Sequence, residues 1–305
     1  MNLGIKERLE ETLEKYAISQ AQAAREINYH PSVLSAYRKD EYKGDVQKLE
    51  GAIVQWLARQ AKARERKTVA TVETADLARV TSAIQIAHTE KDIALIVSDA
   101  GSGKSTAAAW YARYNEKSVV LINVVSGMNR RMLVHEMARQ LSIDIMKVSY
   151  NTLVTNVSDT LFERDMVVIL DEADYLRPDA LEFTRRLVYD LGKSGLVLIG
   201  LPRLKYQIQN LRNDHRQLES RIGVCLHLSG LTRTDAITIA ESVWPKISKK
   251  IVDAIYNVSK NDVRQFTKII ERMQQTMAIN NVAEPDVDIV ETAAALIMRR
   301  GGQAA

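Results

Sequence analysis

Residues 97–106 read VSDAGSGKST, and this stretch decides the fold of the chain. It follows the apolar run 93–97 and leads into TAAAWY at 106–111, a good helix-forming sequence. A strand, a glycine-rich turn, a Lys-Ser pair and a helix together form the context of a phosphate-binding loop. The sequence therefore predicts a nucleotide site at the end of a buried strand.

Each residue type in this loop has a physical role in holding ATP. Gly101 and Gly103 let the backbone curl so that successive N–H groups point at phosphate oxygens. A helix that begins near Lys104 directs its positive dipole end at the same anion. Lys104 would bridge the β- and γ-phosphates, and the Ser105 hydroxyl would hold Mg²⁺. The expected nucleotide-binding residues are Ser98, Asp99, Ala100, Gly101, Ser102, Gly103, Lys104, Ser105 and Thr106.

Ser98 departs from the usual pattern, in which the first residue of the loop is glycine. A serine fits this position if its backbone φ is negative, because a side chain disfavours positive φ. The alternative is a chance Gly/Ser turn before a helix. The apolar run before the loop and the helix former after it favour the phosphate-binding interpretation.

Two acidic residues follow a second apolar run, in the sequence VVILDE at 167–172. If this run is a central strand, Asp171 and Glu172 lie at the sheet edge where the loop also lies. Asp171 would hold Mg²⁺, and Glu172 would orient and deprotonate the attacking water. Two adjacent acids alone are a weak signal. Together with the loop they predict binding and hydrolysis of ATP or GTP.

The chain around these motifs alternates between apolar runs and helical segments. Further runs lie at 118–124, 166–171 and 195–200, separated by helices of ten or more residues. This alternation predicts an α/β fold with a parallel sheet covered on both faces. From residue 232 onward the pattern is helical again.

The first 58 residues predict a compact all-helical unit. Ser19 is a natural N-cap, Asn28 lies in a short turn, and Pro31 suits the first position of the next helix. This spacing is typical of a helix-turn-helix. The alternative is the same motif used for packing or protein contact. The residues expected on the exposed face, as DNA contacts, are Ser32, Ser35, Arg38 and Lys39.

These patterns predict four parts: a helix-turn-helix domain at 1–58, a linker at 59–75, an α/β nucleotide-binding core at 76–230 and a helical lid at 231–305. The linker contains the charged sequence KARERK at 62–67, which is expected to be solvated, with phosphate contact as the alternative.

Composition limits the function class without fixing it. The chain has 305 residues, 46% of them hydrophobic, and a formal net charge of +4, which is compatible with a nucleic-acid partner. Its single cysteine, Cys225, excludes an intramolecular disulfide framework and is expected to be a buried thiol in an apolar run. No apolar run reaches the length of a membrane span, and the first residues do not resemble a signal peptide. A cytoplasmic protein is therefore expected.

The sequence DEADYL at 171–176 resembles the acidic box of AAA+ ATPases. That resemblance implies a five-stranded parallel sheet, a helical lid and two nucleotide-contacting arginines. Arg221, in LESRI, corresponds to an arginine finger acting on a neighbouring subunit, and Arg264, in NDVRQF, to a second sensor. A surface ion pair is the alternative for each. The usual polar first sensor is missing from the sequence LPR at 201–203, or displaced to Arg203.

The order of motifs over nearly the whole chain resembles the target-capture ATPases of transposing bacteriophages. The resemblance includes EYKGD at 41–45, the phosphate loop, the acidic box and SRI at 220–222. It implies a DNA-stimulated ATPase that binds double-stranded DNA largely without sequence specificity. Such proteins assemble as a helical filament, a homo-oligomer, and deliver the DNA to a DDE transposase in the bacterial host cytoplasm.

Basic side chains would line the filament where it contacts DNA phosphates, which gives affinity without sequence preference. The expected contacts are Arg130, Arg131 and Lys147, with Arg203, Lys205 and Arg212 as weaker candidates. Solvated surface charges are the alternative for each. Two other functions stay open. One is a helicase-loader-like AAA+ ATPase, and the other is a nucleotide-gated helix-turn-helix regulator with a preferred DNA sequence.

Overall fold

The computed structural model describes residues 4–15, 18–65, 71–146, 148–209, 216–280 and 282–298 of the chain. It consists of two compact units, Met1–Thr68 and Val69–Ala305. Each unit has its own hydrophobic core. Within the described ranges, no helix has both the length and the apolar character needed to cross a membrane.

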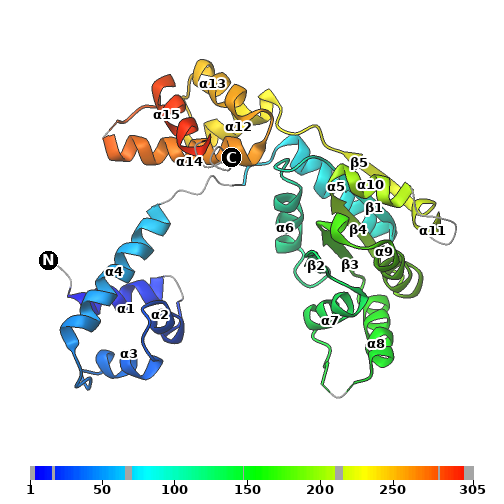
Figure 1. The fold of residues 1–305 in the computed structure, drawn as a ribbon, viewed down its shortest axis with the longest axis horizontal. Helices are drawn as coiled ribbons and strands as arrows, with labels where there is room; N and C mark the ends of the chain where they lie inside the picture. Colours follow the sequence, from blue (N-terminus) through cyan, green and yellow to red (C-terminus); the bar gives the residue numbers. More distant parts are fainter. Residues whose placement is uncertain are drawn as a thin grey trace, which may run out of the picture. The chain divides into compact units, whose positions relative to one another are not determined.

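The first unit is built from helices, as its sequence indicates (Figure 1). They are α1 Ile5–Lys15, α2 Gln20–Glu26, α3 Pro31–Arg38 and α4 Val46–Glu65. Leu34, Leu49 and Trp56 are fully buried where the helices meet. The indole Nε1 of Trp56 donates to Glu26 Oε2 at 2.7 Å, so the one polar atom of this large side chain has a partner inside the unit.

The helix boundaries of this unit follow from capping. Ser19 Oγ accepts from the Gln22 amide, and Pro31 occupies the first turn of α3. The region expected to be a linker differs in its first part, because α4 continues to Glu65. The sequence ARQAKARE at 58–65 consists entirely of strong helix formers, so it extends the helix instead of interrupting it.

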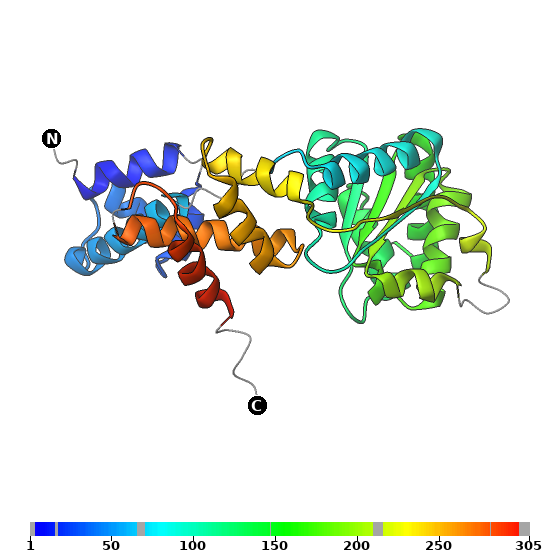
Figure 2. The same cartoon turned by 90° about the horizontal axis from the view of Figure 1, so that it is seen from above.

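The second unit contains a five-stranded sheet with the order β2-β3-β4-β1-β5, and every pair is parallel (Figures 1 and 2). The strands are β1 Ile93–Val97, β2 Val119–Asn123, β3 Val167–Asp171, β4 Gly195–Gly200 and β5 Ile222–His227. The helices before and between them are α5 Ala75–Glu90, α6 Lys104–Tyr114, α7 Arg130–Gln140, α8 Tyr150–Glu163, α9 Pro178–Thr184, α10 Pro202–Gln209 and α11 Arg216–Glu219. A 3₁₀ turn, η1 Ala173–Tyr175, follows β3, and a π-helix, η2 Arg185–Leu191, follows α9.

The sheet is covered on both faces because its central strands, apart from Asp171 at the end of β3, carry no polar side chain. Successive side chains of a strand point to opposite faces. Leu170 therefore packs in the core formed with α7, α8 and α9, whereas Ile169 packs in the core formed with α5 and α6. All five positions of β1 and β3 are buried. This confirms the α/β prediction and brings the carboxyl ends of β1 and β3 to one edge.

β5 is the strand that the apolar runs did not predict. Its residues alternate between half-buried and exposed, as befits a strand at the edge of a sheet. Cys225 points to the exposed side. The expectation of a buried thiol is therefore wrong, because that expectation treated the run as buried on both faces.

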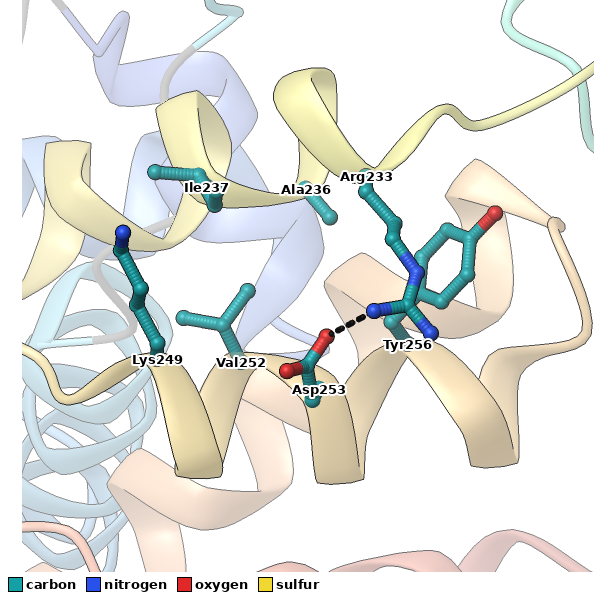
Figure 3. A pocket seen from close by; sticks show the side chains of 7 residues that line it. All are labelled: Arg233, Ala236, Ile237, Lys249, Val252, Asp253 and Tyr256. Carbon is teal, nitrogen blue, oxygen red and sulfur yellow. Dashed lines mark hydrogen bonds and ion pairs between the residues drawn. The ribbon is translucent and has the colours of Figure 1, made fainter.

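The last helices form the lid: α12 Arg233–Val243, α13 Lys249–Ser259, α14 Val263–Asn280 and α15 Val287–Met298. Ser248 caps α13 through the Ile251 amide, and Phe266 is fully buried in the lid core. A pocket of about 170 Å³ lies between α12 and α13, and Figure 3 shows the side chains that line it. In it, Arg233 lies over the Tyr256 ring at 5.4 Å and pairs with Asp253 at 2.9 Å, which links the two helices.

His88 connects α5 to the core and gives the fold a pH dependence. Its Nδ1 lies 2.9 Å from the Tyr111 hydroxyl, and its Nε2 lies 3.1 Å from the Asp165 carbonyl. Burial lowers the pKa of His88 below its ordinary value of 6.5, and the charge of Lys91 adds to the effect. The imidazole is therefore neutral in the folded chain near pH 7. In this form Nε2–H donates to the carbonyl, and Nδ1 lies beside the Tyr111 hydroxyl, which donates to Gln85 Oε1 at 3.0 Å.

We expect the free energy of unfolding to decrease as pH falls below 6.5. In this range His88 binds a proton in the unfolded chain but stays neutral in the folded chain, because its folded pKa is lower. The slope from one such group is at most about 1.4 kcal/mol per pH unit. The stabilisation is complete above pH 6.5 and is lost towards the folded pKa. Urea unfolding of the wild type and His88→Gln between pH 5 and 8 tests this. If both proteins show the same pH dependence, His88 is not responsible.

Candidate nucleotide-binding site

The loop between β1 and α6 has the backbone geometry that phosphate binding requires. Gly101 and Gly103 have φ values of 82° and 90°, in the region that favours glycine. Gly103 is the N-cap of α6, and the helix begins at Lys104. The N–H groups of the first helical turn therefore face the loop, where an anion would meet them.

Lys104 lies inside this loop and is 8% exposed. Its Nζ donates at 2.8 Å to the carbonyls of Ser98 and Asp99 and to the Ser98 hydroxyl, and it lies 3.2 Å from Ser102 Oγ. Burial lowers the pKa of Lys104, while Asp171 and two other nearby carboxylates oppose the shift. The ammonium is thus pre-positioned in the loop, with oxygen partners that phosphate oxygens can replace.

Ser98 fits the loop without the glycine that the usual motif has at this position. Among the described residues, those with positive φ do not include Ser98. Its side chain is 1% exposed, and the hydroxyl contacts both Lys104 Nζ and Ser102 Oγ. The serine therefore satisfies the condition set by its sequence position and contributes to the placement of Lys104.

The two acids of the second motif differ in their environments. Asp171 is the last residue of β3, is 5% exposed, and accepts from the Glu172 amide at 2.9 Å. Glu172 has a φ of 56° and an exposed side chain. This turn separates a buried carboxylate suited to a metal from an exposed carboxylate that can reach a water molecule.

The donor set fits Mg²⁺ only together with nucleotide oxygens. Among the described residues, no group of three or more His, Cys, Asp or Glu side chains could hold a metal ion. The Ser105 side chain is exposed at the start of α6, and Asp171 lies close enough to influence Lys104. One hydroxyl, one carboxylate, phosphate oxygens and water are a normal ligand set for Mg²⁺.

Asp174 organises the position where a first sensor was expected. Its carboxylate accepts from the Leu201 amide at 3.1 Å and from Arg203 Nε at 2.7 Å. Arg203 also lies over the Tyr175 ring, 5.0 Å from the centroid. The residue suggested as a displaced sensor therefore pairs with an acid of the second motif and attaches α10 to η1.

The lid reaches the phosphate loop through the start of α14. The Arg264 amide donates to the Gly101 carbonyl at 3.3 Å, and the Arg264 side chain is exposed. Asp262 caps α14 through the Gln265 amide at 2.9 Å. A Cβ on Gly101 would overlap the Asp262 carboxylate, so this glycine is needed for close approach as well as for its φ. The structure thus brings Arg264 to the loop, as the second-sensor hypothesis requires.

Arg221, the candidate finger, lies in a different cluster. It precedes β5 and forms an ion pair with Asp190 of η2. Its guanidinium also lies 5.7 Å from the Tyr189 ring centroid. Within its own chain, Arg221 therefore forms an ion pair, which was the alternative to a nucleotide contact. A role as an arginine finger would place it against the nucleotide of a neighbouring subunit.

Two of the expected DNA contacts line a depression of about 480 Å³ at the start of α7. Arg130 pairs with Asp179 at 2.9 Å, whereas Arg131 lies over the Tyr150 ring at 5.6 Å. Arg131 thus retains charge for a phosphate, and Arg130 is partly neutralised. Lys147 and Arg212 lie outside the described residues.

In the first unit the expected DNA contacts differ in availability. Ser32 and Lys39 are exposed, and Ser35 is half-buried. Arg38 does not lie free on that face. Its guanidinium forms two hydrogen bonds to Glu10, at 2.5 and 2.6 Å, and a third to Gln20. Arg38 is therefore half-buried and paired with Glu10 of α1, and its role as a DNA contact stays a prediction.

Sequence reasoning missed the roles of three acids: Asp174 pairs with Arg203, Asp190 pairs with Arg221, and Asp262 caps α14. Asp174 belongs to the DEAD sequence and could have been noticed as its third acid. Asp262 precedes an amphipathic helix, which is the usual signal for an N-cap. Asp190 has no such signal, because its partner Arg221 is distant in sequence and the two meet through a π-helix.

Comparison with known proteins agrees with this geometry. Residues 87–208 match the family described as AAA domain. The chain is 26% identical over 240 residues to the Mu-like prophage FluMu DNA transposition protein B of Haemophilus influenzae, covering 77% of this chain and 83% of that protein. It is 24% identical over 245 residues to the ATP-dependent target DNA activator B of Escherichia phage Mu, covering 78% and 77%.

The fold is also similar to that of a solved archaeal protein. The Aeropyrum pernix ORC2 protein, in a structure with ADPNP and ADP, superposes with a TM-score of 0.57 at 16% identity, covering 72% of this chain and 66% of that chain. This likeness supports the arrangement of sheet and lid. Residues 87–208 thus match the AAA domain family within an α/β AAA+ fold, and the chain is distantly related to the transposition B proteins of Mu-like phages.

Proposed function

We propose that this chain is an ATP-dependent DNA-binding ATPase that assembles on double-stranded DNA and delivers it to a DDE transposase. The observation that carries the proposal is the loop around Lys104, joined to an acidic pair and touched by the lid. The distant relationship to an ATP-dependent target DNA activator supports the choice of partner. Such a protein would act in the cytoplasm of a bacterial host.

In the hydrolysis step, backbone N–H groups of the loop and Lys104 hold the phosphates of ATP. Mg²⁺, held by Ser105 and Asp171, would supply positive charge at the phosphate oxygens. Glu172 orients the attacking water and accepts its proton, since its carboxylate is exposed beside the buried Asp171. Arg264 contacts the nucleotide from the lid, where its backbone already touches Gly101.

A neighbouring copy completes the site in this proposal. Arg221 is 37% exposed at its side chain and lies outside the loop's own contacts, so it acts on the nucleotide of an adjacent subunit. Hydrolysis then depends on assembly, because the arginine that stabilises charge on the γ-phosphate comes from that neighbour. Repeated head-to-tail contacts of this kind generate a ring where the rotation closes and an open filament where it does not, and the proposed arrangement is a filament on DNA.

In this proposal the protein contacts the phosphates of the DNA rather than the edges of the bases. Arg131 is the strongest described candidate, since the aromatic ring beside it leaves its charge available. Arg130 and Lys147 are proposed with it, and Ser32, Ser35 and Lys39 would belong to a helix-turn-helix surface. Binding of this kind is salt-dependent and indifferent to sequence. A helicase loader, or a regulator with one preferred site, is the competing function.

Negative-stain imaging of the full chain with random-sequence duplex DNA tests the proposal. We expect continuous filaments with ATP and Mg²⁺ and few with ADP, because the γ-phosphate is the group that a neighbour's arginine recognises. Fluorescence anisotropy should give equal affinities for unrelated duplexes. Discrete particles on one preferred sequence would favour the regulator instead.

A further inference from the structure

Arg221 shares the carboxylate of Asp190 with a second arginine, Arg185. One carboxylate oxygen of Asp190 accepts from Arg185 and the other accepts from Arg221. The two arginines differ in burial, since the side chain of Arg185 is 3% exposed and that of Arg221 is 37% exposed. A buried cation and a surface cation are thus joined through one acid.

The π-helix η2 creates this arrangement. Arg185 and Asp190 are five residues apart, and in an α-helix such residues lie about 140° apart around the axis. The i→i+5 hydrogen bonds of a π-helix bring them to one face, where they pair. The wide turn therefore presents the Asp190 carboxylate, already held on one side, to the surface near Arg221.

The contacts on the two arginines are unequal. Arg185 also donates to Glu182 Oε1 at 2.8 Å and to Gln217 Oε1 at 3.3 Å, so several acceptors hold it. In the part of the chain that the structure describes, the Arg221 side chain contacts Asp190 and the Tyr189 ring. If Arg221 leaves, Asp190 still pairs with Arg185, and no buried charge is left alone. Removing a partner from a buried pair is costly, but here the buried pair survives.

We propose that Asp190 is a positioning residue that holds Arg221 on its own subunit until a neighbouring subunit's nucleotide takes its place. A partly exposed ion pair is weak. Several charge-assisted hydrogen bonds to a phosphate in a closed interface are stronger. Arg221 therefore moves when a neighbour presents ATP and stays docked otherwise. This inference rests on the proposed function, because it takes Arg221 as the arginine that acts between subunits.

The test measures ATP turnover of the full chain against protein concentration, with saturating ATP, Mg²⁺ and random-sequence duplex. Asp190→Asn removes the charge that holds Arg221 while Glu182 keeps Arg185. We expect the protein concentration for half-maximal turnover to fall roughly two- to fivefold, the equivalent of one exposed ion pair. The turnover per subunit at saturation should stay at the wild-type value.

Glu182→Gln is the matched control, because it removes one carboxylate from the same cluster without touching Arg221. It should keep the wild-type half-maximal concentration. Tyr189→Leu loosens Arg221 and leaves both ion pairs of Arg185 in place. It should shift the concentration in the same direction as Asp190→Asn, and it replaces that variant if thermal unfolding shows that Asp190→Asn is unstable.

The possible results distinguish a failure of the role of Asp190 from a failure of the proposed function. An unchanged or raised half-maximal concentration in both Asp190→Asn and Tyr189→Leu, with turnover abolished in Arg221→Ala, would overturn the role of Asp190 alone. Wild-type turnover in Arg221→Ala would remove the arginine from catalysis and overturn the inference with it. A wild-type chain whose turnover does not respond to DNA or concentration would contradict the proposed function itself.

Discussion

Lys104→Ala is expected to lose nucleotide binding and, with it, assembly on DNA. The Lys104 ammonium is the buried cation of the loop, and its donors would move from loop oxygens to phosphate oxygens. Hydrogen bonds to charged groups contribute about 1.5–3 kcal/mol each. The loss of two therefore weakens ATP binding by at least about 100-fold. Titration with a fluorescent ATP analogue measures this effect directly.

The same substitution also changes the stability of the loop itself. The carbonyls of Ser98 and Asp99 lose a donor, which costs stability, but an ammonium no longer has to be buried. Thermal unfolding without nucleotide measures the balance. Lys117→Ala removes an exposed lysine beyond the same helix and should bind ATP like the wild type. Tight ATP binding by Lys104→Ala would disprove the role of the loop.

The core of this fold could be predicted because three of its strands, β1, β3 and β4, are almost entirely apolar. The runs that became β1, β3 and β4 are buried on both faces, so composition alone revealed them. β5 escaped because one of its faces is exposed and its pattern alternates. A central strand is apolar throughout and an edge strand alternates, and the sequence does not show which position in the sheet a strand will take.

The nucleotide site was predictable to the extent that it is local in sequence. The loop places Gly101, Gly103 and Lys104 by backbone geometry within a few residues. Asp171 joins them because parallel strands end at one edge. Arg38 and Arg221, in contrast, have partners 28 and 31 residues away, and the sequence does not identify the acid with which either one pairs. Their pairing depends on helix packing, and a pattern of charges does not reveal it.

Glu172→Gln is expected to separate ATP binding from hydrolysis. The substitution keeps the shape of an exposed side chain at a φ of 56°, and it leaves the Glu172 amide bonded to Asp171. Glutamine orients water but does not accept its proton. General-base catalysis contributes roughly 10²–10⁴-fold, so turnover should fall by at least about 100-fold. ATP affinity should change less than about twofold, because the carboxylate acts on the water and not on the phosphates.

If ATP is the assembly signal, this variant should accumulate ATP-bound assemblies that the wild type disassembles as it hydrolyses. Filaments on random-sequence duplex should persist after excess ATP is removed, while wild-type filaments shorten. Glu163→Gln, an equivalent change at an exposed position at the end of α8, should behave like the wild type. Hydrolysis at the wild-type rate by Glu172→Gln would assign the base to another residue. Slow hydrolysis without persistent filaments would leave Glu172 as the base and separate assembly from the nucleotide state.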